Sequence, residues 1–299
     1  MRFLTFSYKD ADKRLGVLSS DGNYVLCLTD AQKHFGDSGI PATMLEVVQQ
    51  GEKLLPAITG LLNKAVAGQY AFISIDHVTI HAPYNNPPRN IFCLGLNYSA
   101  HAQESGYDPA KISAFPIFFT KPNTTIADPD TAVDGHCAET QQYDYETELA
   151  VIIGKTGKNI AMENAYDHVF GYSIINDLSA RDLQRRTSQW FSGKCLDESA
   201  PFGPYLVHKS AVADPQSLDL CCTVNGELRQ ETNTSHMTFN IASIIAALSK
   251  GTTLMAGDII STGTCAGVGS RLTPAQFLKA GDTIEMTIQS IGTLRNTIR

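Results

Sequence analysis

The sequence has no CxxC pair, and its seven cysteines are odd in number and scattered along the chain. Disulfide frameworks and cysteine-rich zinc sites both need paired or regularly spaced thiols. Their absence favours free cysteines in a reducing compartment. We therefore expect a cytoplasmic protein.

Long hydrophobic runs and an excess of positive charge are also missing. No apolar stretch approaches the ~20 residues that span a bilayer, and the stretch MRFLTFSYKDADKR carries too many charges for a signal peptide. The chain has 23 Lys and Arg residues against 30 Asp and Glu residues, a net charge of −7. We therefore expect neither a membrane nor a nucleic acid as a partner.

The first part of the chain has the pattern of a small α+β module. Within residues 1–80, short segments alternate like strands and two later segments have apolar residues at helical spacing. The strand-like segments are 2–8, 14–20 and 23–28, and the helical ones are 43–50 and 52–66. Proline and asparagine then crowd into HAPYNNPPRN, so residues 81–90 are the predicted linker.

Residues 91–299 are predicted to form a mixed α/β domain that is mostly β. Strand-like runs outnumber short helical segments, which favours a rolled or sandwiched sheet over alternating βαβ units. Asn225-Gly226 is a strong hairpin signal. The expected helices are 99–106, 163–171, 179–187 and 239–251.

Three acidic residues stand at the ends of apolar strand-like runs. Glu146 and Glu148 are two apart in DYETELAVIIG, so they point to the same face of a strand, and Asp177 ends YSIIND. Exposed carboxylates at strand ends would be one explanation. Carboxylates that converge would instead need a hard cation, Mg²⁺ or Mn²⁺ with Ca²⁺ as an alternative, because zinc more often recruits histidine or cysteine.

Two pairs of polar residues at helical spacing are further candidates. His101 and Glu104 stand three apart, and a carboxylate that fixes one imidazole nitrogen makes the other a better base. Arg181 and Gln184 have the same spacing, and Arg181 is suited to a bidentate grip on a substrate carboxylate. The alternative for both pairs is a solvated helix surface, to which we assign Arg185 and Arg186.

Two other segments carry single candidates. Lys194 is a lone lysine in WFSGKCLDES, and Trp190 in the same segment is expected to pack. Thr264 lies in the glycine-rich stretch STGTCAGVG, which is not a Walker loop but whose backbone can approach a carboxylate and offer N–H donors. Cys265 as a nucleophile is disfavoured because no histidine is adjacent in sequence.

The segments YDYETELAVIIG, HVFGYSIINDLSARDLQ and STGTCAGVG, preceded by GLNYSAHAQESG, resemble the fumarylacetoacetate hydrolase family in order and spacing. The resemblance runs from about residue 89 to the C-terminus, and residues 1–80 are similar to the extension of longer members. It implies a β-sandwich roll, usually a homodimer. It also implies a divalent metal on Glu146, Glu148 and Asp177, and a lid over ESGYDPAK.

The same resemblance implies roles for the remaining residues. His101 and Glu104 would supply the base that activates water, Lys194 would stand near the metal-bound oxygens, and Arg181, Gln184 and Thr264 would bind the substrate. Relatives usually have proline where this chain has Cys265, so the position of Thr264 is less constrained here.

These roles predict an enzyme that acts on small 2-oxo carboxylic acids through a metal-stabilised enolate. We expect hydrolytic C–C cleavage of 2,4-dioxo acids, as in acylpyruvate hydrolases, with oxaloacetate decarboxylation as the alternative. Isomerases, hydratases and lyases resemble the same family. A non-catalytic organic-acid binder is the alternative from a different class.

Overall fold

The computed structural model describes residues 1–9, 12–106, 108 and 115–299. More residues lie in strands than in helices, 33% against 27%, which confirms the mixed α/β, mostly β class. None of the described helices is long and apolar enough to cross a bilayer.

The larger sheet has twelve strands. Its strands are β1 (Arg2–Ser7), β2 (Arg14–Leu18), β3 (Tyr24–Cys27), β4 (Ile73–Ser74), β5 (Thr79–His81), β6 (Ile91–Gly95), β7 (Ile117–Lys121), β8 (Ile126–Ala127), β11 (Thr147–Ile153), β13 (Val169–Asn176), β15 (Ala200–His208) and β19 (Ile259–Ser261). They are hydrogen-bonded in the order β4-β3-β2-β1-β15-β13-β11-β19-β6-β7, with β5 beside β1 and β8 beside β15.

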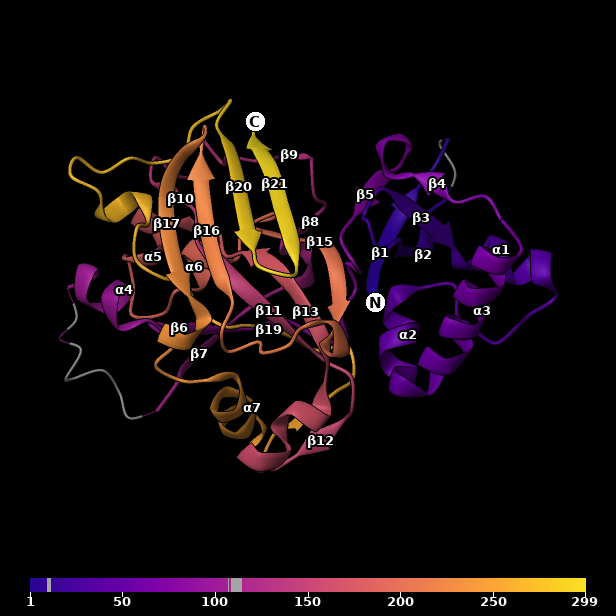
Figure 1. Ribbon diagram of the computed structural model, residues 1–299. Coiled ribbons are helices and arrows are strands. Elements are labelled where there is room, and N and C mark those ends of the chain that lie inside the picture. The colour runs from indigo at the N-terminus through magenta and orange to yellow at the C-terminus, as the bar shows by residue number, and fades with distance from the viewer. Residues whose placement is uncertain (10–11, 107, 109–114) are drawn as a thin grey trace.

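A second sheet covers one face of the first (Figure 1). It contains β9 (Ala132–Val133), β16 (Asp219–Val224), β17 (Glu227–Asn233), β20 (Thr283–Ile288) and β21 (Gly292–Ile298), in the order β17-β16-β20-β21-β9. Asn225 and Gly226 both have positive φ and join β16 to β17, which confirms the predicted hairpin. Two short pairs complete the strands, β10 (Tyr143–Asp144) with β14 (Ser179–Ala180) and β12 (Gly157–Lys158) with β18 (Thr253–Leu254).

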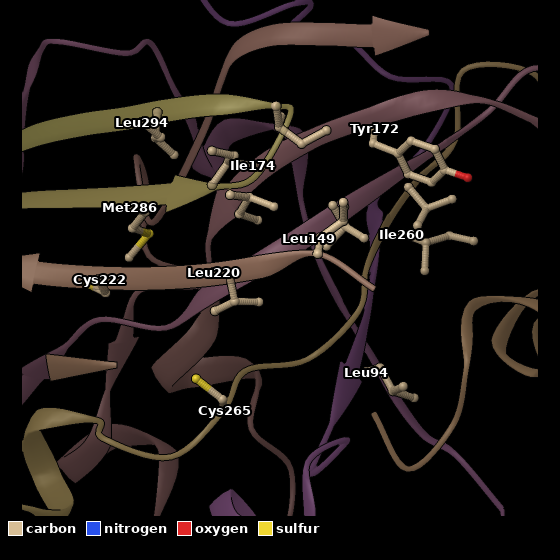
Figure 2. Packing of buried hydrophobic residues seen from close by; sticks show 14 of the residues in the cluster. Leu94, Leu149, Tyr172, Ile174, Leu220, Cys222, Ile260, Cys265, Met286 and Leu294 are labelled. Atoms are coloured by element: carbon tan, nitrogen blue, oxygen red, sulfur yellow. The ribbon is translucent and has the colours of Figure 1, made fainter. Parts of the chain in front are cut away.

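Strand β11 is buried on both faces, which explains the unbroken apolar run from Leu149 to Ile153. Leu149 belongs to the core between the two sheets, where Figure 2 shows it near Leu220 and Ile260. Ile152, on the opposite face, belongs to a second core with Val47 of the N-terminal helices. The middle of the large sheet therefore lies between a sheet and a helical layer.

The N-terminal strands extend the large sheet. β1 pairs with β15 in antiparallel register, with Arg2 opposite Val207. Beside these N-terminal strands lie the helices α1 (Leu28–Phe35), α2 (Met44–Gln50) and α3 (Leu55–Ala67) (Figure 1). Within residues 81–90, Tyr84 is buried and donates to the carbonyl oxygen of Gly257 at 3.0 Å. The division into module 1–80, linker 81–90 and catalytic domain 91–299 stays a prediction.

The remaining helices are short. They include α4 (Ser99–Glu104), the 3₁₀ helix η5 (Met162–His168), α5 (Arg181–Gln184), α6 (Phe191–Lys194), α7 (Ile241–Ser249) and several shorter 3₁₀ turns, among them η8 (Gly269–Arg271). Two sequence predictions were wrong in extent. Residues 169–171 join β13 instead of continuing a helix, because they pair with β11 and β15. Residues 179–180 form β14 against β10, so α5 begins only at Arg181. It ends at Gln184 and is therefore one turn long.

His208, at the end of β15, is a buried histidine packed edge-on against Phe170 at 5.1 Å between ring centroids. Burial, followed by the charges of the N-terminal amino group and Lys209, lowers the pKa of His208 to about 4. The fold therefore favours the neutral ring. The neutral ring contributes its full stabilisation above pH ~6.5, the pKa of histidine in the unfolded chain. This stabilisation is lost as the pH falls toward 4, the pKa in the folded protein.

We expect His208→Asn to weaken this pH dependence. Asparagine keeps an acceptor for the backbone N–H of Ser210, which His208 Nδ1 accepts at 3.2 Å, but it does not titrate. Between pH 7 and pH 4.5 the wild type should lose on the order of 2 kcal/mol more unfolding free energy than the variant. Urea unfolding at both pH values measures this, with the exposed His77→Asn as control. Equal pH slopes in wild type and His208→Asn would contradict the assignment.

Candidate metal site and substrate cavity

The three acidic residues singled out in the sequence meet at one point. Ligand oxygens of Glu146, Glu148 and Asp177 all lie within 4.8 Å of one another, and all three side chains are buried. Glu148 enters on β11, Asp177 follows β13, and these strands pair directly, with Glu148 opposite Ile175. The backbone N–H of Asp177 donates to the carbonyl of Glu146 at 2.9 Å, which fixes the two residues side by side.

Two lysines satisfy part of this negative charge. Lys194 Nζ lies 2.6 Å from Glu146 Oε2 and 2.7 Å from Asp177 Oδ2. Lys121 Nζ donates to Asp177 Oδ1 at 2.8 Å and is completely buried at the end of β7. Burial alone would lower the pKa of Lys194, but Asp177 and Glu146 raise it above its usual value, so its ammonium stays charged.

Glu148 differs from its two neighbours because, among the residues that the structure describes, no salt bridge joins its carboxylate to a lysine or arginine. Its Oε2 accepts hydrogen bonds from Ser261 Oγ at 2.5 Å and from the Gly263 N–H at 2.7 Å. Burial, followed by the charges of Asp177 and Glu146, raises the pKa of Glu148 well above its usual value. One carboxylate of the cluster is therefore short of positive charge.

Arg181 is held by the site's own acids. Its Nε donates to Asp144 Oδ2 at 2.8 Å, its Nη2 lies 2.6 Å from Glu146 Oε1, and its Nη1 donates to Gln184 Oε1 at 3.1 Å. Burial alone would raise the pKa of Glu146, but Lys194 and Arg181 hold it well below its usual range. Arg181 thus orients Glu146, and its predicted grip on a substrate carboxylate stays a prediction.

His101 and Glu104 form the predicted pair on α4. His101 Nδ1 lies 2.8 Å from Glu104 Oε1, and the other oxygen of Glu104 accepts from the Gly267 N–H at 3.0 Å. The carboxylate is thus fixed at both oxygens. Since Nδ1 faces Glu104, the second ring nitrogen, Nε2, is the one free to exchange a proton.

The glycine-rich loop after β19 does offer N–H donors to carboxylates, but these belong to the chain itself. The N–H groups of Gly263, Gly267 and Gly269 donate to Glu148, Glu104 and Asp144, respectively. Gly263 has φ +93°, a conformation that few residues other than glycine adopt. The loop therefore positions three acidic side chains of the site.

Thr264 and Cys265 are both buried in this loop. Thr264 Oγ1 donates to the carbonyl of Thr147 at 3.1 Å and accepts from Gln230 Nε2 at 2.8 Å. Burial raises the pKa of the Cys265 thiol to about 12, which is the opposite of what a nucleophilic cysteine needs.

A cavity of about 310 Å³ opens over the cluster. Seven of the nine predicted site residues line it, namely His101, Glu146, Glu148, Arg181, Gln184, Lys194 and Thr264. The other two, Glu104 and Asp177, stand behind His101 and Lys194. Trp190 both lines the cavity and packs, because it lies edge-on to Phe119 at 5.4 Å and covers Gly95 so closely that a Cβ there would clash.

Lys121 and Asp144 are site residues that we did not predict. Both carried a signal: Asp144 continues the alternation of Glu146 and Glu148, and Lys121 ends the apolar strand IFFTK as Asp177 ends its own. The predicted lid over ESGYDPAK lies in part outside the described residues, at 107 and 109–111.

The donor set fits a hard divalent cation. Three carboxylates converge, and Lys194 Nζ bridges Glu146 and Asp177, so the space between them accepts a positive charge. Four buried carboxylates, counting Asp144, face the three buried cations Lys121, Arg181 and Lys194. A divalent ion would supply the missing charge beside Glu148, and oxygen-only ligands favour Mg²⁺ or Mn²⁺.

Residues 90–299 match the family model described as Fumarylacetoacetate (FAA) hydrolase C-terminal. The chain belongs to the fumarylacetoacetate hydrolase family. It is 46% identical over 284 residues to oxaloacetate tautomerase YisK of Bacillus subtilis (strain 168), covering 93% of this chain and 94% of that protein. It is also 39% identical to the human mitochondrial oxaloacetate tautomerase FAHD2A, over 95% of this chain and 87% of that one.

Solved structures of family members have the same fold. The fumarylacetoacetate hydrolase of Exiguobacterium antarcticum superposes with a TM-score of 0.83 at 37% identity, covering 100% of this chain and 99% of that one. The maleylpyruvate hydrolase of Sphingobium sp. SYK-6, in complex with manganese(II) and pyruvate, has a TM-score of 0.78 at 29% identity, with 100% and 98% covered. This family of metal-dependent enzymes acting on 2-oxo acids fits the site described here.

Proposed function

We propose that this chain is a divalent-metal-dependent enzyme that interconverts the keto and enol forms of oxaloacetate. The observation that carries the proposal is the placement of one oriented base, His101, in the same small cavity as the three-carboxylate cluster. The 46% identity to a protein named oxaloacetate tautomerase supports it.

In this reaction the chain's own residues bind the substrate and move one proton. Glu146, Glu148 and Asp177 would hold the Mg²⁺ or Mn²⁺, which when bound supplies a Lewis acid for the keto oxygen of a 2-oxo acid. His101 Nε2 takes a proton from C3 and, as the imidazolium, delivers that proton to the C2 oxygen; the reverse reaction runs the same two transfers backwards. Glu104 stabilises the imidazolium that forms on the way.

The remaining residues stabilise charge. Lys194 brings an ammonium to the cavity wall, so it can attract the oxygens on which negative charge develops. Arg181 holds Glu146 in place through their contact at 2.6 Å, and Asp144 in turn holds Arg181 at 2.8 Å. Gln184 and Thr264 add polar groups to the same wall.

Hydrolysis of acylpyruvates is the second candidate. The same His101–Glu104 pair could deprotonate a water molecule, and a maleylpyruvate hydrolase is among the structural neighbours. The two reactions differ in product, since tautomerisation releases nothing whereas hydrolysis and decarboxylation both release pyruvate.

Two assays with Mg²⁺ or Mn²⁺ separate these activities. The first follows the loss of enol absorbance after addition of enol-rich oxaloacetate, and the second follows pyruvate release from oxaloacetate and acetylpyruvate. Rapid enol loss that EDTA abolishes, without pyruvate, is the expected result. Pyruvate from acetylpyruvate would favour the hydrolase, and no metal-dependent turnover in either assay would overturn both.

We expect His101→Gln to lower kcat/KM for tautomerisation by about 10²- to 10⁴-fold, the usual effect of losing a general base. Its affinity for oxalate in the presence of Mg²⁺, measured by calorimetry, should stay within about threefold, because no proton moves on binding. His236→Gln, at an exposed histidine, serves as control. Full activity of His101→Gln would exclude it as the base.

A further inference from the structure

Two arginines lie on the wall of the cavity without a role in the account above. Arg185 follows the last residue of α5, and Arg271 ends the 3₁₀ helix Gly269–Arg271. Both line the same cavity as Glu146 and Glu148. The sequence had assigned Arg185 to a solvated helix face, together with Arg186. The helix ends after one turn, and Arg185 is exposed as expected but also lines the cavity.

Asp144 and Asp182 lie near enough to Arg185 to act on its charge, but the hydrogen-bond partners of both arginines are neutral groups. Arg185 Nη1 donates to Gln142 Oε1 at 3.4 Å, and Arg271 Nη2 donates to the carbonyl of Ser105 at 3.3 Å, so both partners are neutral. No salt bridge within the described ranges involves either residue. Burial, followed by the charges of Arg271 and Arg181, lowers the pKa of Arg185. This part of the wall is therefore positive, in contrast to the charge-matched Arg181.

The cavity has the size and polarity for a short, charged substrate. Its volume of about 310 Å³ has room for a small dicarboxylic acid. Besides the arginines, Thr187, Ser188 and Ser270 line the cavity. The aromatic residues Phe119 and Trp190 also line the cavity and are packed against Lys194 and Gly95.

We propose that Arg185 and Arg271 bind the second carboxylate of the substrate, so that the cavity selects 2-oxo dicarboxylic acids over 2-oxo acids with uncharged tails. The inference rests on the proposed function, in which the three-carboxylate cluster holds the 2-oxo acid end. An arginine offers parallel N–H donors to a carboxylate, and two arginines without acidic partners can bind one anion between them. Both are specificity-determining residues and move no proton.

Malate and lactate form a matched pair of probes. Both are unreactive 2-hydroxy acids that can chelate Mg²⁺ at the same end, and only malate carries a second carboxylate. We expect wild-type protein with Mg²⁺ to bind malate at least about tenfold more tightly than lactate. Arg185→Gln and Arg271→Gln should each reduce this ratio about threefold to fivefold, because exposed ion pairs are modest, and the double variant should bring it close to one.

Arg186→Gln is the matched control, since Arg186 is exposed and is not among the residues that line the cavity in the described part of the chain. It should leave the ratio unchanged. In turnover, the arginine variants should raise KM for oxaloacetate by the same factors and leave kcat within about twofold, the signature of uniform binding.

The outcomes separate the two proposals. If the wild type turns over no oxaloacetate, the proposed function fails, but the malate-to-lactate ratio still reports on the arginines. A ratio near one in the wild type, a ratio unchanged in the double variant, or no binding of either acid with Mg²⁺ would each overturn the arginine proposal. If only the double variant's ratio is unchanged, turnover of oxaloacetate would remain intact and the proposed function would stand.

Discussion

Replacing Glu148 with glutamine is expected to abolish metal-dependent turnover while leaving the metal-free protein about as stable as the wild type. Loss of one of three carboxylate ligands should lower kcat/KM by at least about 10³-fold, more than the 10- to 100-fold typical of residues behind the ligands. Glu148 forms no salt bridge with a described lysine or arginine, and burial beside Asp177 and Glu146 raises its pKa, so a neutral glutamine strands no cation and costs little.

Glu146→Gln is the contrasting variant. It should also abolish turnover, but it leaves Lys194 and Arg181 buried without their shared anion, which costs about 3–5 kcal/mol of unfolding free energy. Urea unfolding in EDTA and tautomerase assays with Mn²⁺ give both quantities for both variants. If Glu148→Gln kept activity within tenfold of wild type, or was destabilised as strongly as Glu146→Gln, the roles assigned here would be wrong.

Replacing Lys121 with methionine should destabilise the metal-free protein by about 3–5 kcal/mol, because it strands the Asp177 charge in a buried site. Lys194 would remain beside Asp177, but it is shared with Glu146. Added Mg²⁺ should restore part of the loss, since an ion bound to the native state alone stabilises it by about 2.7 kcal/mol at a hundred times its Kd.

The measurement is urea unfolding with EDTA and then with Mg²⁺. Lys13→Met is the control, because Lys13 pairs with Asp128 at 3.2 Å on the surface and such pairs contribute about 1 kcal/mol or less. A loss below about 1 kcal/mol for Lys121→Met would show that this buried charge does not depend on its lysine.

The local sequence pattern singled out three acidic residues, and the resemblance to the family implied that they bind one metal ion. Glu146 and Glu148 alternate at the start of a strand, Asp177 ends another, and antiparallel pairing of β11 with β13 brings the ends together. His101 and Glu104 were singled out by their three-residue spacing, which brings side chains together on a helix, and the resemblance implied their role as the base.

Long-range contacts could not be predicted in this way. Lys121 lies 56 residues from Asp177 and reaches it only because β7 pairs with β6 and β6 pairs with β19 in parallel. No local pattern encodes that strand order. Arg185 is exposed, as the sequence predicted, but its place on the cavity wall was not predicted, because it depends on where α5 ends. The amide groups of the glycine-rich loop were expected to face a ligand, but the fold directs three of them to the site's own acids.

The most direct test of the metal site is a crystal grown with Mn²⁺ and oxalate, with data collected at the manganese absorption edge. The account predicts one strong anomalous peak within about 2.5 Å of carboxylate oxygens from Glu146, Glu148 and Asp177, a distance compatible with oxygen ligands of hard cations. No peak at this cluster, or a strong peak on other residues, would contradict it.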